Sequence, residues 1–104
     1  MIKNKRIKPF FGRGRTINSG HPIYVFNKYK KEYEFIGLTH SPITRGIKNI
    51  KLDKNPNPKD FKDSYLRPFK DRSNEKINTK YSSWKFCETD KSKVKSVIKQ
   101  NKKS

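Results

Sequence analysis

The amino-acid sequence predicts a small, mainly β protein of the α+β class, with one antiparallel sheet, curled or partly closed into a barrel, and a C-terminal helix. Short segments rich in β-branched and aromatic residues alternate with turn residues along most of the chain, which is typical of antiparallel strands. The spacing of apolar residues changes to a helical period only near the C-terminal end. The length of 104 residues, of which 30% are hydrophobic, suits one domain with a small core.

Residues 1–20 are predicted to be a basic, flexible tail that precedes a single domain at residues 21–104. The tail carries six cations and no acidic residue; the cations are Lys3, Lys5, Arg6, Lys8, Arg13 and Arg15. Basic arms of this kind commonly stay disordered until they bind a polyanion. Phe10 and Phe11 have two interpretations, because they can stack on bases or fold back onto the domain.

The first predicted element of the domain is a β-hairpin. Residues 23–26 form a dense apolar and aromatic run, residues 27–32 are polar, and residues 33–39 return as the second strand. Successive side chains of a strand point to opposite faces, and in the second strand both alternating sets are largely apolar. We therefore expect residues 36–38 to be buried on both faces of the sheet.

The remaining elements have weaker signals. Further short strands are predicted at residues 47–52, 64–69 and 82–87, for about five strands in all. Loops are predicted at residues 40–46, 53–63 and 70–80. The run Asn-Pro-Asn-Pro at residues 55–58 is a strong turn signal, because proline lacks the backbone N–H that a helix or central strand needs.

The C-terminal segment is predicted to be an amphipathic helix over about residues 90–101, with Thr89 or Asp90 as its N-cap. Val94, Val97 and Ile98 fall at i, i+3 and i+4, so they form one narrow apolar stripe. Lysines fill most of the remaining surface. This pattern favours a helix that docks on the sheet and exposes its lysines to solvent.

The net charge limits the partners of the protein more than its fold. Lys and Arg number 27 against 9 Asp and Glu, for a formal net charge of +18. An excess of this size favours a polyanion, and nucleic acid is the usual one. A merely soluble, lysine-rich protein is the alternative. No apolar run approaches the ~20 residues that span a membrane, so we expect no membrane partner.

The cysteine and histidine counts exclude further classes of protein. The single cysteine, Cys87, cannot form a disulfide within the chain, which favours the reducing cytoplasm. One cysteine and two histidines cannot complete a structural zinc site. There is neither a Walker-type phosphate loop nor a cluster of carboxylates, so two-metal chemistry is not predicted. We expect no metal and no other cofactor.

The richest stretch for chemistry runs from Thr39 to Arg45, at the end of a predicted buried strand. Metal-free RNA cleavage needs a base for the proton of the 2′-OH, an acid for the leaving oxygen and a cation beside the phosphate. His40 can be acid or base, because histidine exchanges a proton near neutral pH. Arg45 or Arg67 can supply the cation, and Thr39 or Ser41 can bind a phosphate oxygen. The same residue types also form ordinary turns, or a phosphate-binding loop without catalysis.

Further residues are predicted to bind nucleic acid together with the cations of the tail: Lys48, Tyr65 and Arg67. Period two places Tyr65 and Arg67 on one face, where Tyr65 can stack on a base and Arg67 can reach a phosphate. Tyr65 can equally be a core residue. His21 is either a second acid or base, or simply the residue that precedes the first strand of the domain.

Four short segments occur in order within residues 21–69: HPIYVF, GLTHSP, NIKL and SYLRP. Together they resemble the PemK/MazF-like toxins of toxin–antitoxin systems and their relatives in abortive phage defence. The resemblance implies an SH3-like barrel, a metal-independent endoribonuclease activity, and an antitoxin of protein or RNA. It marks Thr39 and Ser41 as the hydroxyls at the strand end. The family also has an opening strand followed by a basic residue, and the sequence of residues 1–20 indicates no such strand.

Two nucleic-acid functions therefore remain open, beside a third possibility, an inhibitor or interaction protein whose positive face binds an acidic or nucleic-acid-binding partner. The first is a small, metal-independent endoribonuclease toxin of a toxin–antitoxin or phage-defence system that acts on RNA in the cytoplasm. The second is a non-catalytic nucleic-acid-binding module, such as an accessory protein of a phage or mobile element. The charge and the aromatic residues suit both functions, whereas the stretch around His40 favours the first.

Overall fold

The computed structural model describes residues 9–14, 21–29, 31–74, 77–78, 81 and 83–100. Its strands are β1 Phe10–Gly14, β2 Pro22–Lys28, β3 Tyr33–Thr39, β4 Ile43–Thr44, β5 Ile47–Lys48, β6 Ile50–Lys51, β7 Tyr65–Leu66, β8 Asp71–Ser73 and β9 Ile77–Asn78. A single helix in the described part of the chain, α1, spans Glu88–Lys99.

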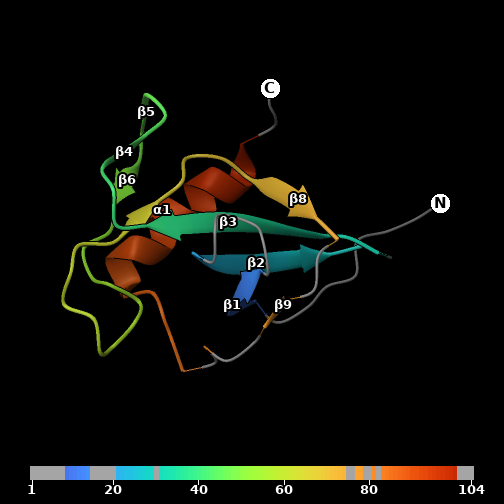
Figure 1. The fold of residues 1–104 in the computed structure, drawn as a ribbon, viewed down its shortest axis with the longest axis horizontal. Helices are drawn as coiled ribbons and strands as arrows, with labels where there is room; N and C mark the ends of the chain where they lie inside the picture. The colour runs from blue at the N-terminus through green and yellow to red at the C-terminus, as the bar shows by residue number, and fades with distance from the viewer. Residues whose placement is uncertain are drawn as a thin grey trace.

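The strands form a seven-stranded sheet and a separate two-stranded hairpin (Figure 1). The sheet has the order β6-β7-β3-β2-β1-β9, and β8 pairs with β3 beside that path. The pairings are antiparallel. The helix α1, orange to red in Figure 1, crosses one face of the sheet, and the green β4–β5 hairpin stands away from both. The predicted class, a curled antiparallel sheet with a C-terminal helix, is confirmed.

The predicted β-hairpin over residues 23–39 is confirmed as β2 and β3. These strands pair from Ile23 opposite Gly37 to Lys28 opposite Tyr33, with a register shift between Val25 and Asn27. The expected burial on both faces is also found, because every residue from Phe35 to Leu38 is buried.

The prediction of a flexible tail over residues 1–20 is wrong for Phe10–Gly14, which form β1. Phe11 pairs with Tyr24 of β2 and is only 4% exposed. Its ring lies 4.9 Å from the ring of Phe86 and 5.8 Å from that of Trp84. The sequence around Phe10 and Phe11 is dense in positive charge, which is typical of a disordered arm. The strand could not be predicted from it, because its burial depends on partners far along the chain. Five of the predicted binding cations lie outside the described residues: Lys3, Lys5, Arg6, Lys8 and Arg15.

Three predictions about the later strands also need correction. The described residues 83–87 do not form a strand, because the N–H of Trp84 donates to the carbonyl of Tyr81 in a turn. The rings of Trp84 and Phe86 still pack on the core. The predicted loop at residues 70–80 contains β8 and β9, which are held by main-chain pairing with β3 and β1. The predicted strand at residues 47–52 is divided, since β5 pairs with β4 from the predicted loop at residues 40–46, and β6 pairs with β7.

Two groups of buried side chains lie on the two faces of the sheet. Ile36 and Leu38 of β3 belong to the larger group, which also contains Leu52 and Leu66. The alternate residues of β3, Tyr33 and Phe35, belong to a smaller group on the other face.

The helix α1 completes the larger group through the predicted apolar stripe. Val94 is 4% exposed and Val97 is 1% exposed, and Ile98 packs beside them. The helix begins two residues before the predicted start, with Cys87 as its N-cap. No helix in the described part of the chain is long and apolar enough to cross a membrane.

Candidate active site

The end of β3 brings together residues from three neighbouring strands. Thr39 lies opposite Tyr65 of β7, and the N–H of Arg67 donates to the carbonyl of Gly37 at 2.9 Å. On the other side of β3, Ile23 pairs with Gly37, so the same register carries His21 to a position beside Thr39. The chain therefore places a histidine, a hydroxyl and an arginine at one end of the sheet.

Two cavities adjoin this end of β3. The smaller, of about 240 Å³, is lined by Arg13, His21, Thr39, His40, Tyr81 and Trp84, among others. The larger, of about 570 Å³, is lined by Thr44, Arg45, Arg67 and Phe69, among others. Both cavities are lined by His21, Leu38 and Thr39, so these residues form a wall common to the two. Gly37 also lines the larger cavity.

His40 is oriented by a carboxylate from a distant loop. Its Nε2 lies 2.8 Å from Oδ2 of Asp60, and the side chains are 48% and 23% exposed. The N–H of Lys62, and then the bond to His40, hold the pKa of Asp60 below its usual range. The carboxylate is therefore ionised at neutral pH, so Nε2 of His40 is the donor in this bond. The other ring nitrogen, Nδ1, has no hydrogen-bond partner among the described residues.

The loop at residues 53–63 fixes the position of Asp60 through turns made by its own side chains. The N–H of Asn57 donates to Oδ1 of Asn55, and the N–H of Lys62 donates to Oδ1 of Asp60 at 3.0 Å. Asn and Asp favour such turns because their side chains reach the backbone two residues on. The Nδ2 of Asn55 also donates to the carbonyl of Lys62 at 3.0 Å, which ties the two ends of the loop together. The segment at residues 55–58, which the sequence predicts to be a turn, is thus part of the hydrogen-bonded loop that supports His40.

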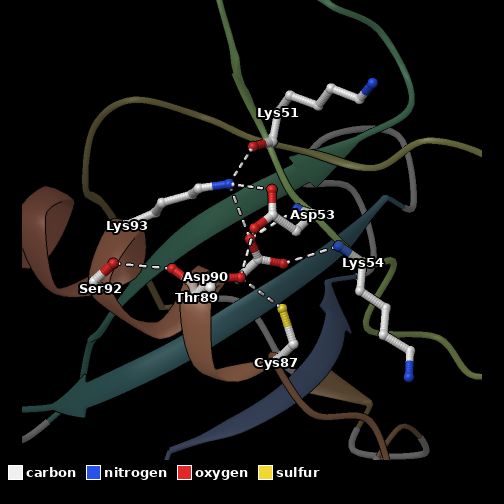
Figure 2. Close-up of polar contacts among 8 residues, drawn as sticks. All are labelled: Lys51, Asp53, Lys54, Cys87, Thr89, Asp90, Ser92 and Lys93. Atoms are coloured by element: carbon white, nitrogen blue, oxygen red, sulfur yellow. Dashed lines mark hydrogen bonds and ion pairs between the residues drawn. The ribbon is translucent and has the colours of Figure 1, made fainter.

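The helix anchors the beginning of the same loop through Asp90, which is fully buried. One carboxylate oxygen accepts the N–H of Asp53 at 2.8 Å, and the other accepts the N–H of Lys54 at 3.1 Å. Lys93 lies 3.0 Å from Asp90 and also donates to the carbonyl of Lys51, as Figure 2 shows. Asp90, one of the two predicted cap residues, therefore accepts N–H groups of the loop backbone, whereas the N-cap of the helix is Cys87.

The charge of Asp90 is stabilised in spite of its burial. Burial alone raises the pKa of Asp90, but the N–H groups of Asp53 and Lys54, followed by Lys93 and Cys87, together hold it below its usual range. One ligand atom each of Asp53, Cys87 and Asp90 lies within 4.8 Å of the others. The carboxylate oxygens there already accept N–H donors from the backbone and from Lys93.

Asn49 connects the protruding hairpin to Arg67. Its Nδ2 donates to the carbonyl of Ser41 at 2.9 Å and to the hydroxyl of Thr44 at 2.8 Å. Its Oδ1 accepts an N–H from Nη1 of Arg67 at 2.9 Å. The guanidinium of Arg67 also lies 4.7 Å from the centre of the Phe69 ring. Two contacts thus fix Arg67, and no carboxylate pairs with it among the described residues.

Arg45 occupies the tip of the β4–β5 hairpin in a conformation that is rare for its residue type. Its φ is +51° and that of Gly46 is +80°, so the two residues form a turn of the mirror-image type that matches strand twist. Glycine, asparagine and aspartate favour this conformation, whereas arginine is costly there. The turn directs Arg45 to the larger cavity, which it lines.

The predicted site residues therefore separate into those that line a cavity and those that do not. Thr39, His40 and Arg13 line the smaller cavity, and Arg45 and Arg67 line the larger one with Thr39. Ser41, Lys48 and Tyr65 line neither cavity. Ser41 serves the local turn instead, because its N–H donates to the hydroxyl oxygen of Thr39 at 3.2 Å. Tyr65 is half-buried. It belongs to the same predicted strand as Arg67, but it does not line the cavity that Arg67 lines.

Sequence reasoning missed Asp60 and Asn49 and left His21 undecided. Asp60 lies 20 residues from His40, within a segment that signals only a turn. Asn49 sits between two short strands, and nothing local indicates that it holds both the hairpin and Arg67. The proline after His21 was the only local signal, because it forces an extended backbone that continues the strand register.

Fold and site together define a small, basic α+β protein with paired cavities at one end of its sheet. The chain matches no protein-family model, no curated protein and no solved structure.

Proposed function

We propose that this protein binds RNA and cleaves it without a metal ion, by attack of a ribose 2′-OH on the neighbouring phosphate. The observation that carries this proposal is that His21, His40, Thr39 and Arg13 line one cavity, while Asp60 orients His40. Two histidines and an arginine supply the base, the acid and the cation that the reaction needs.

His40 serves as the base in this mechanism. Its Nε2–H is held by Asp60, so Nδ1 accepts the proton of the 2′-OH while the bond from O2′ to phosphorus forms. Arg13 stabilises the negative charge that develops on the phosphate oxygens. The oxygen of Thr39 already accepts the N–H of Ser41, which leaves its O–H to donate to a phosphate oxygen.

His21 serves as the acid. It lines the cavity beside Thr39, and in its protonated form it gives a proton to O5′ as the bond from phosphorus to O5′ breaks. The products are a 2′,3′-cyclic phosphate and a 5′-OH, with no net loss or gain of protons. Arg45 and Arg67 hold the strand beyond the cleaved bond, in the larger cavity.

The same proposal includes the biological role that the sequence suggests. A small endoribonuclease toxin of the PemK/MazF-like type acts on RNA in the cytoplasm and is restrained by an antitoxin of protein or RNA. The net charge of +18 supports a polyanionic substrate. Purification from the native host, followed by analysis of the bound RNA and protein, tests for such a partner.

Cleavage of single-stranded RNA in EDTA tests the enzymatic proposal. We expect wild-type protein to cut the RNA to 2′,3′-cyclic phosphate ends, and not to cut the matching DNA, which lacks the 2′-OH. His40→Ala should lower the rate by about 10²-fold or more, and Thr39→Ala should also lower it. No cleavage by wild-type protein, or equal cleavage by all three proteins, contradicts the proposal.

Binding without cleavage is the second candidate function. Arg45 and Arg67 have no carboxylate partners among the described residues, and an anion-binding surface suits a non-catalytic module equally well. This function predicts RNA affinity that falls steeply with salt, with a slope of ~0.7 per phosphate contact in a plot of log K against log salt concentration, and intact RNA at the end of the assay.

A further inference from the structure

The lining of the smaller cavity includes a stacked aromatic pair. The rings of Tyr81 and Trp84 lie 4.1 Å apart between centroids and are inclined by only 15°. Both residues are half-buried and pack against the edge of the larger core group. The same cavity is lined by His21 and His40, so an aromatic wall and the proposed catalytic groups face one space. Flat aromatic surfaces of this kind bind nucleobases by stacking, whatever the base.

The loop at residues 53–63 contributes polar groups to this cavity through Asn55 and Asn57. Asn55 is occupied, because its Oδ1 accepts the N–H of Asn57 and its Nδ2 donates to the carbonyl of Lys62. The Oδ1 of Asn57 accepts the N–H of Lys59 at 3.0 Å, whereas its Nδ2 has no acceptor among the described residues. Asn57 therefore offers a donor whose orientation is fixed by its own loop.

We propose that the smaller cavity is a nucleobase pocket, in which one base of the bound RNA stacks on the outer face of the Tyr81–Trp84 pair and accepts a hydrogen bond from Nδ2 of Asn57. A volume of about 240 Å³ lies below the roughly 300–1,000 Å³ of pockets for drug-sized ligands, and it suits one base rather than a run of bases. The pocket gives the proposed ribonuclease a preference for the base beside the cleaved bond, and in that respect it rests on the proposed function.

The position of the pocket agrees with the geometry of a strand that crosses the end of β3. His21 and Thr39 belong to the wall that the two cavities share. A phosphate at that wall has one neighbouring nucleotide in the smaller cavity and the next in the larger cavity, beside Arg67 and Phe69. The base in the smaller cavity is then held by stacking, while the nucleotide in the larger cavity is held by charge.

Trp84 is the only tryptophan of the chain, so its fluorescence reports on this pocket directly. We would titrate the full-length protein with the four nucleoside monophosphates, with ribose 5-phosphate and with inorganic phosphate. At least one nucleotide should change the emission saturably, at a concentration at least tenfold below that of ribose 5-phosphate. Tyr81→Ala and Asn57→Ala should each weaken that nucleotide by about fivefold to tenfold. Tyr29→Ala, far from the cavity at the turn between β2 and β3, is the matched control and should not weaken it.

The outcomes separate the pocket from the chemistry. Equal responses to nucleotides and to ribose 5-phosphate contradict the proposed nucleobase pocket. Unchanged nucleotide binding in both Tyr81→Ala and Asn57→Ala also contradicts it, provided that the thermal unfolding of both variants matches wild type. Because Asn57 lies in a loop, its variant keeps the test decisive if Tyr81→Ala does not fold. Nucleotide binding without RNA cleavage supports the pocket and contradicts the proposed ribonuclease. A set of RNAs that differ only in the base beside the cleaved bond tests the pocket separately. Equal cleavage rates for all of them contradict the pocket but not the ribonuclease.

Discussion

The Nε2 atom of His40 lies 2.8 Å from a carboxylate oxygen of Asp60, although 20 residues separate them in the chain. The other oxygen of Asp60 accepts the N–H of Lys62, so the carboxylate is held from both sides. The contact orients the ring of His40, since Nε2 is engaged by Asp60 and Nδ1 has no partner in the described part of the chain. The pairing is the strongest structural reason to regard His40 as a proton acceptor.

Asp60→Asn tests that relationship. The amide can still contact His40, but it carries no charge to stabilise the imidazolium that forms during proton transfer. We expect RNA cleavage to slow by about tenfold to hundredfold, the usual effect of removing a residue that orients a reactive one. Single-turnover rates at saturating protein measure this. Asp63→Asn is the matched control, because Asp63 is in the same loop and its one ion pair with a described residue is with Lys51 at 3.8 Å. Equal rates for wild type and Asp60→Asn count against the role of His40 as a base.

Asp90→Asn should destabilise the fold. Its amide nitrogen cannot accept the N–H of Asp53 or Lys54, and Lys93 loses its fully buried partner. Loss of such partners from a buried group costs about 3 kcal/mol in the free energy of unfolding. Denaturant unfolding measures this, with the exposed Asp63→Asn as a control that should change stability by less than about 0.5 kcal/mol. A change in Asp90→Asn as small as in the control means that the loop does not depend on the helix.

Asp90 also predicts how stability depends on pH. Its folded pKa is lower than usual, so its contribution is complete above the unfolded value of about 3.9 and is lost as the pH falls through the folded value. Wild-type stability should therefore fall on acidification more steeply than that of Asp90→Asn, and the two should converge. Asp53 and Asp60, whose pKa values are also lowered, account for part of the slope that remains. Parallel pH profiles for the two proteins contradict this assignment.

The elements that sequence could predict are those whose signal is local. The polar sequence at residues 27–32 and the apolar runs on either side predict the β2–β3 hairpin, and Val94 and Val97 define the buried face of α1. The elements that it could not predict depend on distant partners. Trp84 packs on the core without strand pairing, and the polar β8 gains its strand conformation from the backbone of β3.

The same distinction applies to the site. Thr39 and His40 could be proposed from the sequence, because a mixed polar stretch follows a predicted buried strand there. Asp60 could not be assigned, because only the folded loop brings it to His40. Asn49 carries a polar side chain between two strands, and its role depends on the simultaneous approach of Thr44 and Arg67.

Phe11→Ala tests whether β1 belongs to the core. The ring is 4% exposed and contacts Tyr24, Trp84 and Phe86, so its removal leaves a cavity and should cost about 3 kcal/mol. Phe61→Ala is a matched control, because Phe61 is 96% exposed and the same truncation there should cost less than about 0.5 kcal/mol. Thermal and denaturant unfolding measure both variants. Equal stabilities for the two variants support a flexible tail instead of β1.

Arg45→Asn should raise stability while it weakens RNA binding. Arg45 has a φ of +51°, which costs an arginine about 1 kcal/mol, and asparagine before glycine is the preferred sequence for this turn. We expect a gain of about 0.5–1 kcal/mol in the free energy of unfolding and a fivefold to tenfold loss of RNA affinity. Lys48→Asn removes the same charge from the same hairpin, at a residue that lines neither cavity. It should weaken binding less and bring no gain in stability; the reverse order of affinities contradicts the role of Arg45.

Arg67 and Arg72 offer a matched comparison of two arginines that lie over aromatic rings. Arg67 lies 4.7 Å from the Phe69 ring and is fixed by Asn49, with no carboxylate partner in the described part of the chain. Arg72 lies 4.4 Å from the Tyr29 ring and forms ion pairs with Glu32 and Glu34 at 3.6 Å. The positive charge of Arg72 is thus already balanced, whereas that of Arg67 remains available to a phosphate.

Arg67→Lys should therefore weaken RNA binding about tenfold at physiological salt, because lysine keeps the charge but loses the planar fork that grips a phosphate with two N–H groups. The salt slope should stay nearly the same in Arg67→Lys and fall by ~0.7 in Arg67→Ala, which removes one phosphate contact. Arg72→Lys should leave both quantities unchanged. Fluorescence anisotropy of a labelled RNA over a series of salt concentrations measures all of these variants. An equal loss of affinity in Arg67→Lys and Arg72→Lys indicates diffuse attraction to the net charge, and the larger cavity is then not the phosphate site.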